Sequence, residues 1–175
     1  MTKTTNRSRP LARWTALGLA LCCALLLMLA TPAPAEPEDR KDATKRLVRE
    51  YVERCMDGAD LSCMETYWIA EKAAGVRKSE EFRRSYFPDL SYSVESMLAE
   101  GDRVAVVLRV TGHHTGRGKA PKPGEPPLPP SGGELELDEL ALYTVSGGKI
   151  LRGELFSDNM KVAKVLGYTV TPPGR

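Results

Sequence analysis

The chain contains two histidines, and they are adjacent: His113 and His114. Imidazole is the side chain best suited to proton transfer near neutral pH, so this pair is a candidate for acid–base chemistry. The pair falls at the end of a segment that alternates with a period of two, and successive side chains of a strand point to opposite faces. The two rings therefore cannot act on one atom, and we expect at least one of them at the surface.

Cys55 and Cys63 form a second candidate pair, because the other two cysteines, Cys22 and Cys23, lie in an apolar run near the N-terminus. The spacing of Cys55 and Cys63 suits a disulfide between the end of one helix and the start of the next. Closing so short a loop would stabilise the fold by roughly 2–3 kcal/mol. Two buried free thiols are the alternative.

The sequence contains no pattern typical of a metal or cofactor site. Two cysteines and two histidines at these separations do not match a zinc site. A glycine-rich phosphate loop and a nucleophile elbow are also missing from the sequence. We therefore expect neither a bound metal nor a cofactor.

Residues 1–35 predict a cleavable signal peptide. They combine a basic flank, an apolar run over 16–30 that is short for a membrane span, and small residues at a peptidase site over 33–35. We therefore expect Sec-type export with cleavage after Ala35, giving a secreted or periplasmic protein. The alternatives are an uncleaved membrane anchor, which the short run disfavours, and a lipoprotein at Cys22, which the bulky residue before it disfavours.

Removal of the signal peptide changes the net charge from +2 to −2, because four basic residues leave and no acidic residue does. The remaining chain of about 140 residues is long enough for one domain with its own core. It carries no basic patch that would favour nucleic acid. We expect no nucleic-acid partner, and no membrane association after cleavage.

The first part of the mature chain has helical periodicity. Residues 36–41 are predicted to be a polar tether, and apolar residues spaced by three and four predict a helix from Asp42 that ends at Asp57-Gly58. Asp60 is placed to cap a second helix. Residues 68–70 leave that helix and can form a short strand.

Ser79 is predicted to open a third helix, with acidic residues in its first turn. Phe87-Pro88 ends this helix, since the residue before a proline disfavours the helical conformation. The pair Arg83-Arg84 is expected on its solvated face.

The second half of the chain changes to a period of two, which predicts strands. The predicted strands are residues 91–100, 103–115, 134–145 and 149–157, followed by a helix over 159–166. In the second strand one face is the core face: Val104, Val106, Leu108, Val110, Gly112 and His114. Residues 116–133 contain six prolines and are predicted to be a loop. Helices segregated from an antiparallel sheet indicate the α+β class.

Four short segments in this order resemble the SnoaL-like polyketide cyclase family. They are Phe87-Pro88-Asp89-Leu90, Glu100-Gly101-Asp102-Arg103-Val104-Ala105, Gly112-His113-His114-Thr115-Gly116 and Gly148-Lys149-Ile150. The resemblance implies the nuclear transport factor 2-like cone fold: a curved antiparallel sheet packed on three N-terminal helices around an apolar pocket. We delimit this SnoaL-like domain at residues 42–170, and its implied ligand is a small hydrophobic molecule.

The resemblance also locates the family's catalytic positions. Catalytic members use a histidine on the third long strand and an aspartate on the last strand, as acid and base in an aldol-type ring closure. Here these positions hold Ala141 and Leu155, neither of which can move a proton. We therefore expect both residues to line an enclosed cavity in a protein without aldol cyclase activity.

If Ala141 faces the pocket, alternation places Glu139 on the same face, together with Leu135, Leu137 and Tyr143. Leu151, Gly153 and Leu155 then face inward from the last strand. Glu139 with His114 is a candidate catalytic pair, since a carboxylate among apolar neighbours suits a general base. The alternatives are that Glu139 points to solvent near a bulge or pairs with an arginine, or that a bulge turns Glu154 or Asp158 inward.

These observations leave three functional hypotheses. The first is an exported domain that binds a small hydrophobic molecule, with these ligand-binding residues: Tyr51, Trp68, Leu108, Ala141, Tyr143 and Leu155. The second is an enzyme of the ester cyclase, isomerase or hydrolase type that uses Glu139 and His114. The third is an interaction module that forms a homodimer through the outer face of the sheet.

Overall fold

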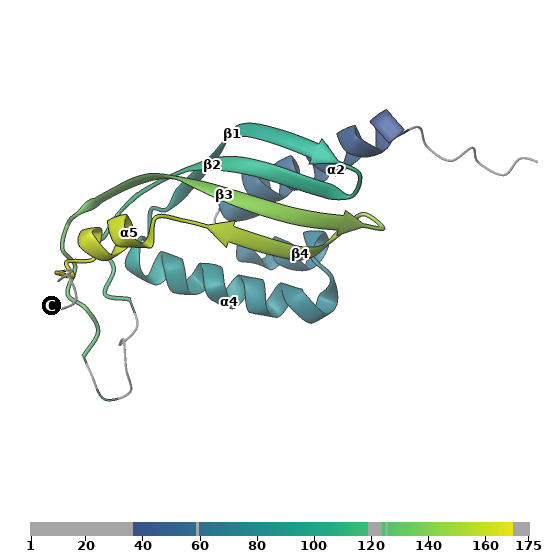
Figure 1. The fold of residues 1–175 in the computed structure, drawn as a ribbon. Helices are drawn as coiled ribbons and strands as arrows, with labels where there is room; N and C mark the ends of the chain where they lie inside the picture. The colour runs from purple at the N-terminus through teal and green to yellow at the C-terminus, as the bar shows by residue number, and fades with distance from the viewer. Residues whose placement is uncertain (1–36, 59, 119–123, 125, 170–175) are drawn as a thin grey trace, which may run out of the picture. The chain divides into compact units, whose positions relative to one another are not determined.

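A four-stranded antiparallel sheet, with its strands in chain order, forms the centre of the fold (Figure 1). Its strands are β1 (Ser91–Glu100), β2 (Arg103–His113), β3 (Glu134–Ser146) and β4 (Lys149–Phe156). The computed structural model describes residues 37–58, 60–118, 124 and 126–169. The predicted signal peptide, with Cys22 and Cys23, lies outside the described residues, as does part of the proline-rich loop.

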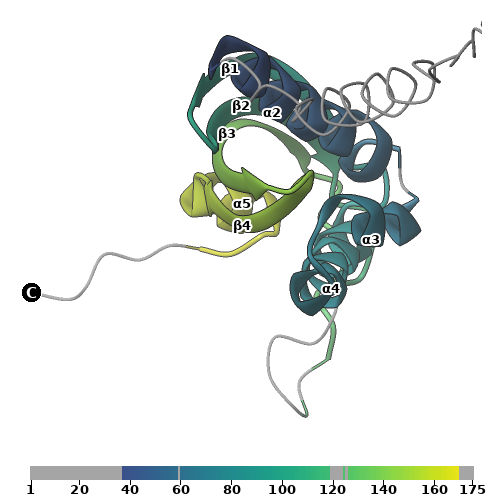
Figure 2. The same cartoon turned by 90° about the vertical axis from the view of Figure 1, so that its right-hand side faces the viewer.

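The sheet curves strongly when it is seen nearly end-on, and helices α2, α3 and α4 lie along its concave side (Figure 2). The inner face of β2 is the centre of the core, as the alternation predicted: Val104, Val106, Leu108 and Val110 are fully buried. The α+β class, with a curved antiparallel sheet packed on three N-terminal helices, is confirmed.

Helix α2 (Pro37–Tyr51) begins five residues earlier than predicted. Residues 37–41 are therefore helical, and the prediction of a polar tether is wrong for them. Their polar character is explained by the helix end: Glu38 and Asp39 lie in the first turn, where negative charge interacts favourably with the helix dipole.

A π-helical turn (Val52–Met56) continues α2 up to Asp57. Gly58 follows, and a Cβ atom there would lie 2.3 Å from the Arg54 carbonyl oxygen, so a close backbone approach requires glycine. Asp60 then caps the next helix as predicted, with its carboxylate accepting a hydrogen bond from the Ser62 amide.

A short 3-10 turn (Leu61–Cys63) and α3 (Met64–Tyr67) follow Asp60. The structure joins Cys55 and Cys63 in a disulfide, with Cα atoms 5.7 Å apart. This bond ties the π-helical turn to the 3-10 turn, as predicted. Of the short strand predicted at 68–70, a single parallel bridge between Trp68 and Ile150 is present.

Helix α4 (Ala70–Tyr86) begins nine residues before Ser79, so the predicted helix start is wrong. Residues 70–78 are mostly good helix formers, and propensity over several residues outweighs one capping residue. The Ser79 hydroxyl donates to the Gly75 carbonyl within the helix instead of capping it. The helix ends at Phe87, before Pro88, as predicted.

Strand β4 contains a bulge that shifts its register against β3. Val145 pairs with Ile150 and Thr144 pairs with Arg152, which leaves Leu151 without a partner. Ile150 is fully buried and takes the core position that was predicted for Leu151. Beyond the bulge, Gly153 and Leu155 return to the inner register.

Helix α5 (Asn159–Val165) follows β4 and is capped by Asp158, whose carboxylate accepts a hydrogen bond from the Lys161 amide. Residues 126–133 contain no helix or strand, which agrees with the loop predicted for that part of the chain. Within the described residues, the helices are too short or too polar to span a bilayer.

Candidate functional site

A cavity of about 460 Å³, which we call pocket A, is lined by residues of α4, β3, β4 and α5. Most of its wall is apolar, and this part consists of Phe82, Tyr86, Phe87, Leu90, Leu135, Leu155, Val162, Leu166 and Tyr168. The polar residues of the wall are Arg83, Glu139, Ser157 and Asn159. Its size and apolar lining are typical of small-molecule sites.

A smaller cavity of about 240 Å³, pocket B, shares Arg83 and Leu155 with pocket A. Three aromatic rings form part of its wall: Tyr51 meets Trp68 and Tyr143 edge-on, with ring centroids 5.9 and 5.8 Å apart. The space depends on Gly153, because a Cβ atom there would lie 2.8 Å from the Trp68 ring.

An ion pair belongs to the wall of pocket A. Arg83 donates to Glu139 Oε1 over 2.7 Å, and the Glu139 side chain is only 2 % exposed. The Arg83 guanidinium also lies over the Tyr92 ring, 5.4 Å from its centroid. Of the alternatives for Glu139, pairing with an arginine is therefore the correct one. The expectation that Arg83 and Arg84 lie on a solvated face is wrong, since their side chains are 25 % and 13 % exposed.

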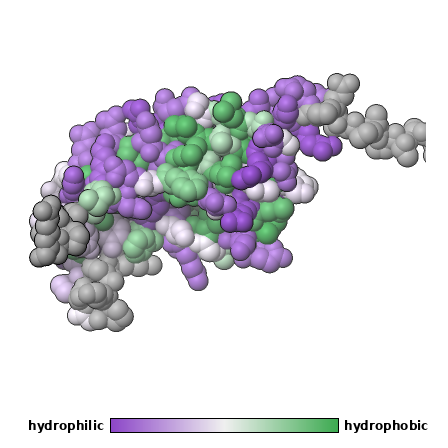
Figure 3. Space-filling view, viewed as in Figure 1, coloured by the Kyte–Doolittle hydropathy of each residue, from purple (hydrophilic) through white to green (hydrophobic). Residues whose placement is uncertain are grey.

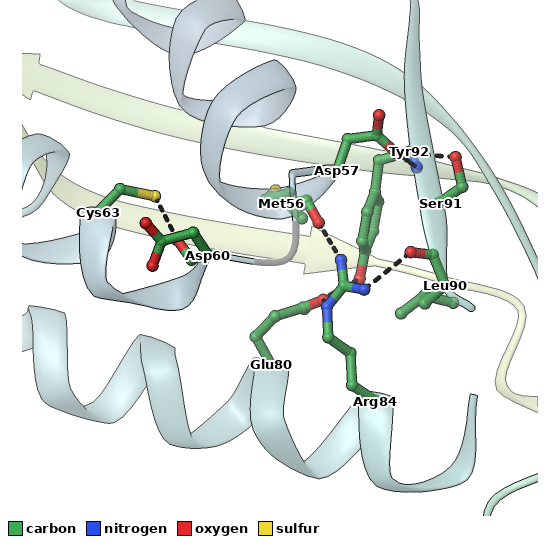
Figure 4. A network of polar contacts seen from close by, with 9 residues as sticks. All are labelled: Met56, Asp57, Asp60, Cys63, Glu80, Arg84, Leu90, Ser91 and Tyr92. Atoms are coloured by element: carbon green, nitrogen blue, oxygen red, sulfur yellow. Dashed lines mark hydrogen bonds and ion pairs between the residues drawn. The ribbon is translucent and has the colours of Figure 1, made fainter. Parts of the chain in front are cut away.

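A second buried carboxylate, Glu80, lines pocket B and lies in a polar network with Arg84 and Tyr92 (Figure 4). The Tyr92 hydroxyl lies 2.9 Å from both oxygens of Glu80, and Arg84 Nε lies 3.2 Å from one of them. Burial raises the pKa of Glu80, and the nearby positive charges and the Tyr92 hydrogen bond oppose this rise. Arg84 also donates to the carbonyl oxygens of Met56 and Leu90, so this network ties α4 to the start of β1.

A family model described as SnoaL-like polyketide cyclase matches residues 45–166, more than two thirds of the chain. The chain belongs to the SnoaL-like polyketide cyclase family. The resemblance found in the four short sequence segments is thereby confirmed.

Solved structures share the SnoaL-like fold at low sequence identity. A SnoaL-like protein from Jannaschia sp. CCS1 has a TM-score of 0.61 and 18 % identity, covering 75 % of this chain and 96 % of its own. AclR from Streptomyces galilaeus has a TM-score of 0.61 and 24 % identity, over 76 % and 87 % of the two chains. IdmH from Streptomyces antibioticus has a TM-score of 0.57 and 21 % identity, over 71 % and 99 %. No curated protein matches the chain in sequence.

In this SnoaL-like domain His114 is fully buried, on the inner face as predicted, but it is not among the residues that line pocket A. Its Nδ1 accepts a hydrogen bond from the Ser131 amide, so the proton of the neutral ring is assigned to Nε2. The Ser131 hydroxyl donates to the Val165 carbonyl. His114 therefore anchors the end of the proline-rich loop near α5, and within the described residues no hydrogen bond or ion pair joins it to Glu139.

His113 points to the opposite face and is exposed, which agrees with the alternation of side chains along β2. Its Nδ1 lies 2.7 Å from Asp89, and this hydrogen bond raises the pKa of His113. The pKa of Asp89 is lowered by the bond from the His113 amide and by the ring. This pair joins the segment before β1 to the end of β2.

The six predicted ligand-binding residues divide into two groups. Four of them line pocket B: Tyr51, Trp68, Tyr143 and Leu155. Leu108 and Ala141 are buried in the core and line neither pocket A nor pocket B. Leu155 is 46 % exposed, so the expectation of an enclosed cavity lined by Ala141 and Leu155 is wrong. The reason is that β4 lies at the edge of the sheet, where its inner face is only partly covered.

Of the three candidate acids, Glu139 is the one buried in the wall of pocket A. Glu154 lines the edge of pocket B and pairs with Arg152, and Asp158 caps α5. The described parts of the chain contain no cluster of three His, Cys, Asp or Glu side chains that could hold a metal.

Sequence reasoning missed the apolar wall from α4 and α5. Phe82 and Tyr86 are one helical turn apart and their rings pack edge to face, with centroids 5.2 Å apart. Their i, i+4 spacing is a signal for a shared face. A helix that begins at Ser79 and ends before Pro88 is too short to define a face, so this spacing did not predict the pocket wall.

Proposed function

We propose that this protein is an exported SnoaL-like domain that binds a small hydrophobic molecule in pocket A, without aldol cyclase activity. The observation that carries the proposal is the cavity of about 460 Å³ with a largely apolar wall. Burying an apolar ligand there is favourable by about 25 cal/mol per Å² of apolar surface removed from water.

The lack of aldol chemistry rests on the two positions that the family resemblance locates. Ala141 and Leu155 are direct partners in the register of β3 and β4, so a histidine and an aspartate at these positions would be neighbours. Alanine and leucine have no side-chain group that can donate or accept a proton. General acid–base groups each contribute about 10²- to 10⁴-fold in rate. A protein that lacks both groups lacks this rate enhancement.

Export is proposed from the signal-like residues 1–35. The disulfide between Cys55 and Cys63 supports it, since such bonds persist in oxidising compartments. The intact mass of the exported protein tests this proposal and is expected to correspond to a chain that begins at Glu36. Retention of Met1, or a lipid on Cys22, would contradict it.

The binding proposal is tested with a neutral fluorescent apolar probe, N-phenyl-1-naphthylamine, titrated into the purified protein. Leu155→Asp places a charge in the pocket wall and is expected to weaken binding by about tenfold or more, because burial of a charge near an apolar ligand is costly. Ala74→Asp is the control: Ala74 is exposed on α4 and lines neither pocket A nor pocket B. Equal effects of the two variants would refute binding in pocket A.

An enzyme that uses Glu139 is a second candidate, favoured by the presence of this carboxylate in the pocket wall. Its pairing with Arg83 and the separate hydrogen bonds of His114 favour the binding role over this one. If Glu139→Gln abolished a measurable turnover, the enzyme would be the correct assignment.

Homodimer formation through the outer face of the sheet is a further proposed property. Figure 3 shows apolar side chains gathered over this face. The register places them in two adjacent rows across the strands: Leu98, Ala105 and Leu142, and Val107, Leu140 and Phe156. Light scattering tests the proposal: the protein should be a dimer, and Leu140→Lys should make it a monomer, whereas Leu155→Asp should not. A monomeric parent protein would refute it.

A further inference from the structure

Two polar atoms in the wall of pocket A are buried and have no hydrogen-bond partner: Glu139 Oε2 and Ser157 Oγ. Buried polar atoms are almost always paired, because an unpaired one loses its bonds to water without compensation. An unpaired atom in a cavity wall therefore indicates a partner that occupies the cavity.

The strand register brings these two residues together. The ladder between β3 and β4 ends at the pair Leu140–Phe156; Glu139 is the adjacent residue of β3, and Ser157 directly follows β4. One position before the end, Ala141 pairs with Leu155 on the inner face, so alternation directs Glu139 to the inner face. Ser157, just beyond the strand, lines the same pocket. They lie where β4 leaves the sheet and pocket A begins.

The chemistry of the two atoms selects a ligand group. A carboxylate oxygen accepts hydrogen bonds, whereas a serine hydroxyl both donates and accepts. A ligand hydroxyl can donate to Glu139 and accept from Ser157 at the same time. A ketone or ether can only accept, and it would leave Glu139 Oε2 unpaired.

The charge of the wall separates a hydroxyl from an amine. Arg83 lies 2.7 Å from the other oxygen, Glu139 Oε1, and balances the negative charge of the carboxylate. An ammonium group would then lie close to the Arg83 guanidinium, and like charges in a poorly solvated site repel. A neutral hydroxyl avoids this repulsion.

We infer that the ligand of pocket A is an apolar molecule that carries a hydroxyl group, recognised by Glu139 Oε2 and Ser157 Oγ. This inference rests on the proposed binding function and names the class of ligand for it. The apolar wall then provides most of the affinity, and these two side chains select for the hydroxyl group.

The test compares 2-naphthol with 2-methoxynaphthalene, which has the same ring system but cannot donate a hydrogen bond. Calorimetry or intrinsic fluorescence should show 2-naphthol binding at least about tenfold more tightly, as expected for a hydrogen bond to a charged acceptor. Equal affinities would overturn the inference while leaving the proposed binding function intact. If neither compound bound, both proposals would fail.

Ser157→Ala is the variant that isolates the second contact. It should weaken 2-naphthol binding by roughly three- to tenfold, the effect of a neutral hydrogen bond, and leave the binding of 2-methylnaphthalene, which has no hydrogen-bonding group, unchanged. Ser96→Ala, on the exposed face of β1, is the control and should change neither affinity. If Ser157→Ala weakened both compounds equally, the serine would only shape the pocket and its assigned contact would be wrong.

Discussion

At the scale of single residues, the unusual feature is the pair of buried carboxylates, Glu80 and Glu139. Each is tolerated because an arginine of α4 lies against it: Arg84 beside Glu80 and Arg83 beside Glu139. Buried ions that lose their partner are strongly destabilising, because the remaining charge stays out of water. These residues are therefore where single substitutions should have large effects.

Arg84→Ala should lower the free energy of unfolding by about 3 kcal/mol, since it removes the ion-pair partner of buried Glu80 and two hydrogen bonds to carbonyl oxygens. Arg77→Ala is the control on the same helix. Arg77 pairs with Glu65 but is 37 % exposed, and exposed ion pairs contribute about 1 kcal/mol or less. Urea unfolding measures both variants, and similar losses would contradict the assigned role of Arg84.

The two histidines should titrate in opposite directions. Burial lowers the pKa of His114 below its ordinary value of 6.5, and the hydrogen bond to Asp89 raises the pKa of His113 above it. Proton NMR of the folded protein should show His113 titrating at higher pH than His114. Asp89→Asn should lower the pKa of His113 and leave that of His114 unchanged.

The lowered pKa of His114 has a consequence for stability. As pH falls below about 6.5, the unfolded chain binds a proton that the folded chain excludes, so stability is lost from there down to the folded pKa. His113 acts in the opposite sense: its contribution is complete below about 6.5 and is lost as pH rises through its raised pKa. Above about pH 6.5, His114 is neutral in both the folded and the unfolded chain and does not reduce stability.

At the scale of elements, the proline-rich loop is held against the end of α4 by backbone contacts. The Gly116 amide donates to the Tyr86 carbonyl, and the Gly118 amide donates to the Ser85 carbonyl. A Cβ atom on Gly116 would lie 2.2 Å from the Ser85 carbonyl oxygen, so this approach requires glycine. Since Tyr86 also lines pocket A, the loop start and the pocket wall share one support.

Gly116→Ala should therefore destabilise the protein by about 1–3 kcal/mol, because backbone must move to admit the methyl group. Gly75→Ala is the matched control, since Gly75 lies inside α4 with nothing within 4 Å of the added Cβ atom. That change should stabilise by about 0.5–1 kcal/mol. Thermal unfolding distinguishes the two, and a neutral Gly116→Ala would show that the loop is not held tightly.

At the scale of the whole molecule, the disulfide links the end of the first helical segment to the start of the next. Thiol counting on denatured, unreduced, exported protein should find no free thiol. Reduction should lower the free energy of unfolding by roughly 2–3 kcal/mol, the chain-entropy effect of a short loop. Two free thiols, or no change in stability on reduction, would contradict this.

Local sequence patterns were enough to predict the strands and the inner face of the sheet. Alternation with a period of two is a local property, so the bounds of β1 and the buried side of β2 were predicted correctly, as was the burial of His114 directly after β2. Capping by Asp60 and the stop before Pro88 were also correct, because both depend on neighbouring residues.

The way in which these elements form a site depends on contacts between distant parts of the chain. Alternation directed Glu139 inward, but its partner Arg83 is 56 residues away in the chain, and their contact depends on how α4 packs on β3. The bulge at Leu151 and the early start of α4 depend on packing and on weak propensities summed over many residues. Local patterns fix which way a side chain points along one element, whereas the group that it meets is set by the packing of distant elements.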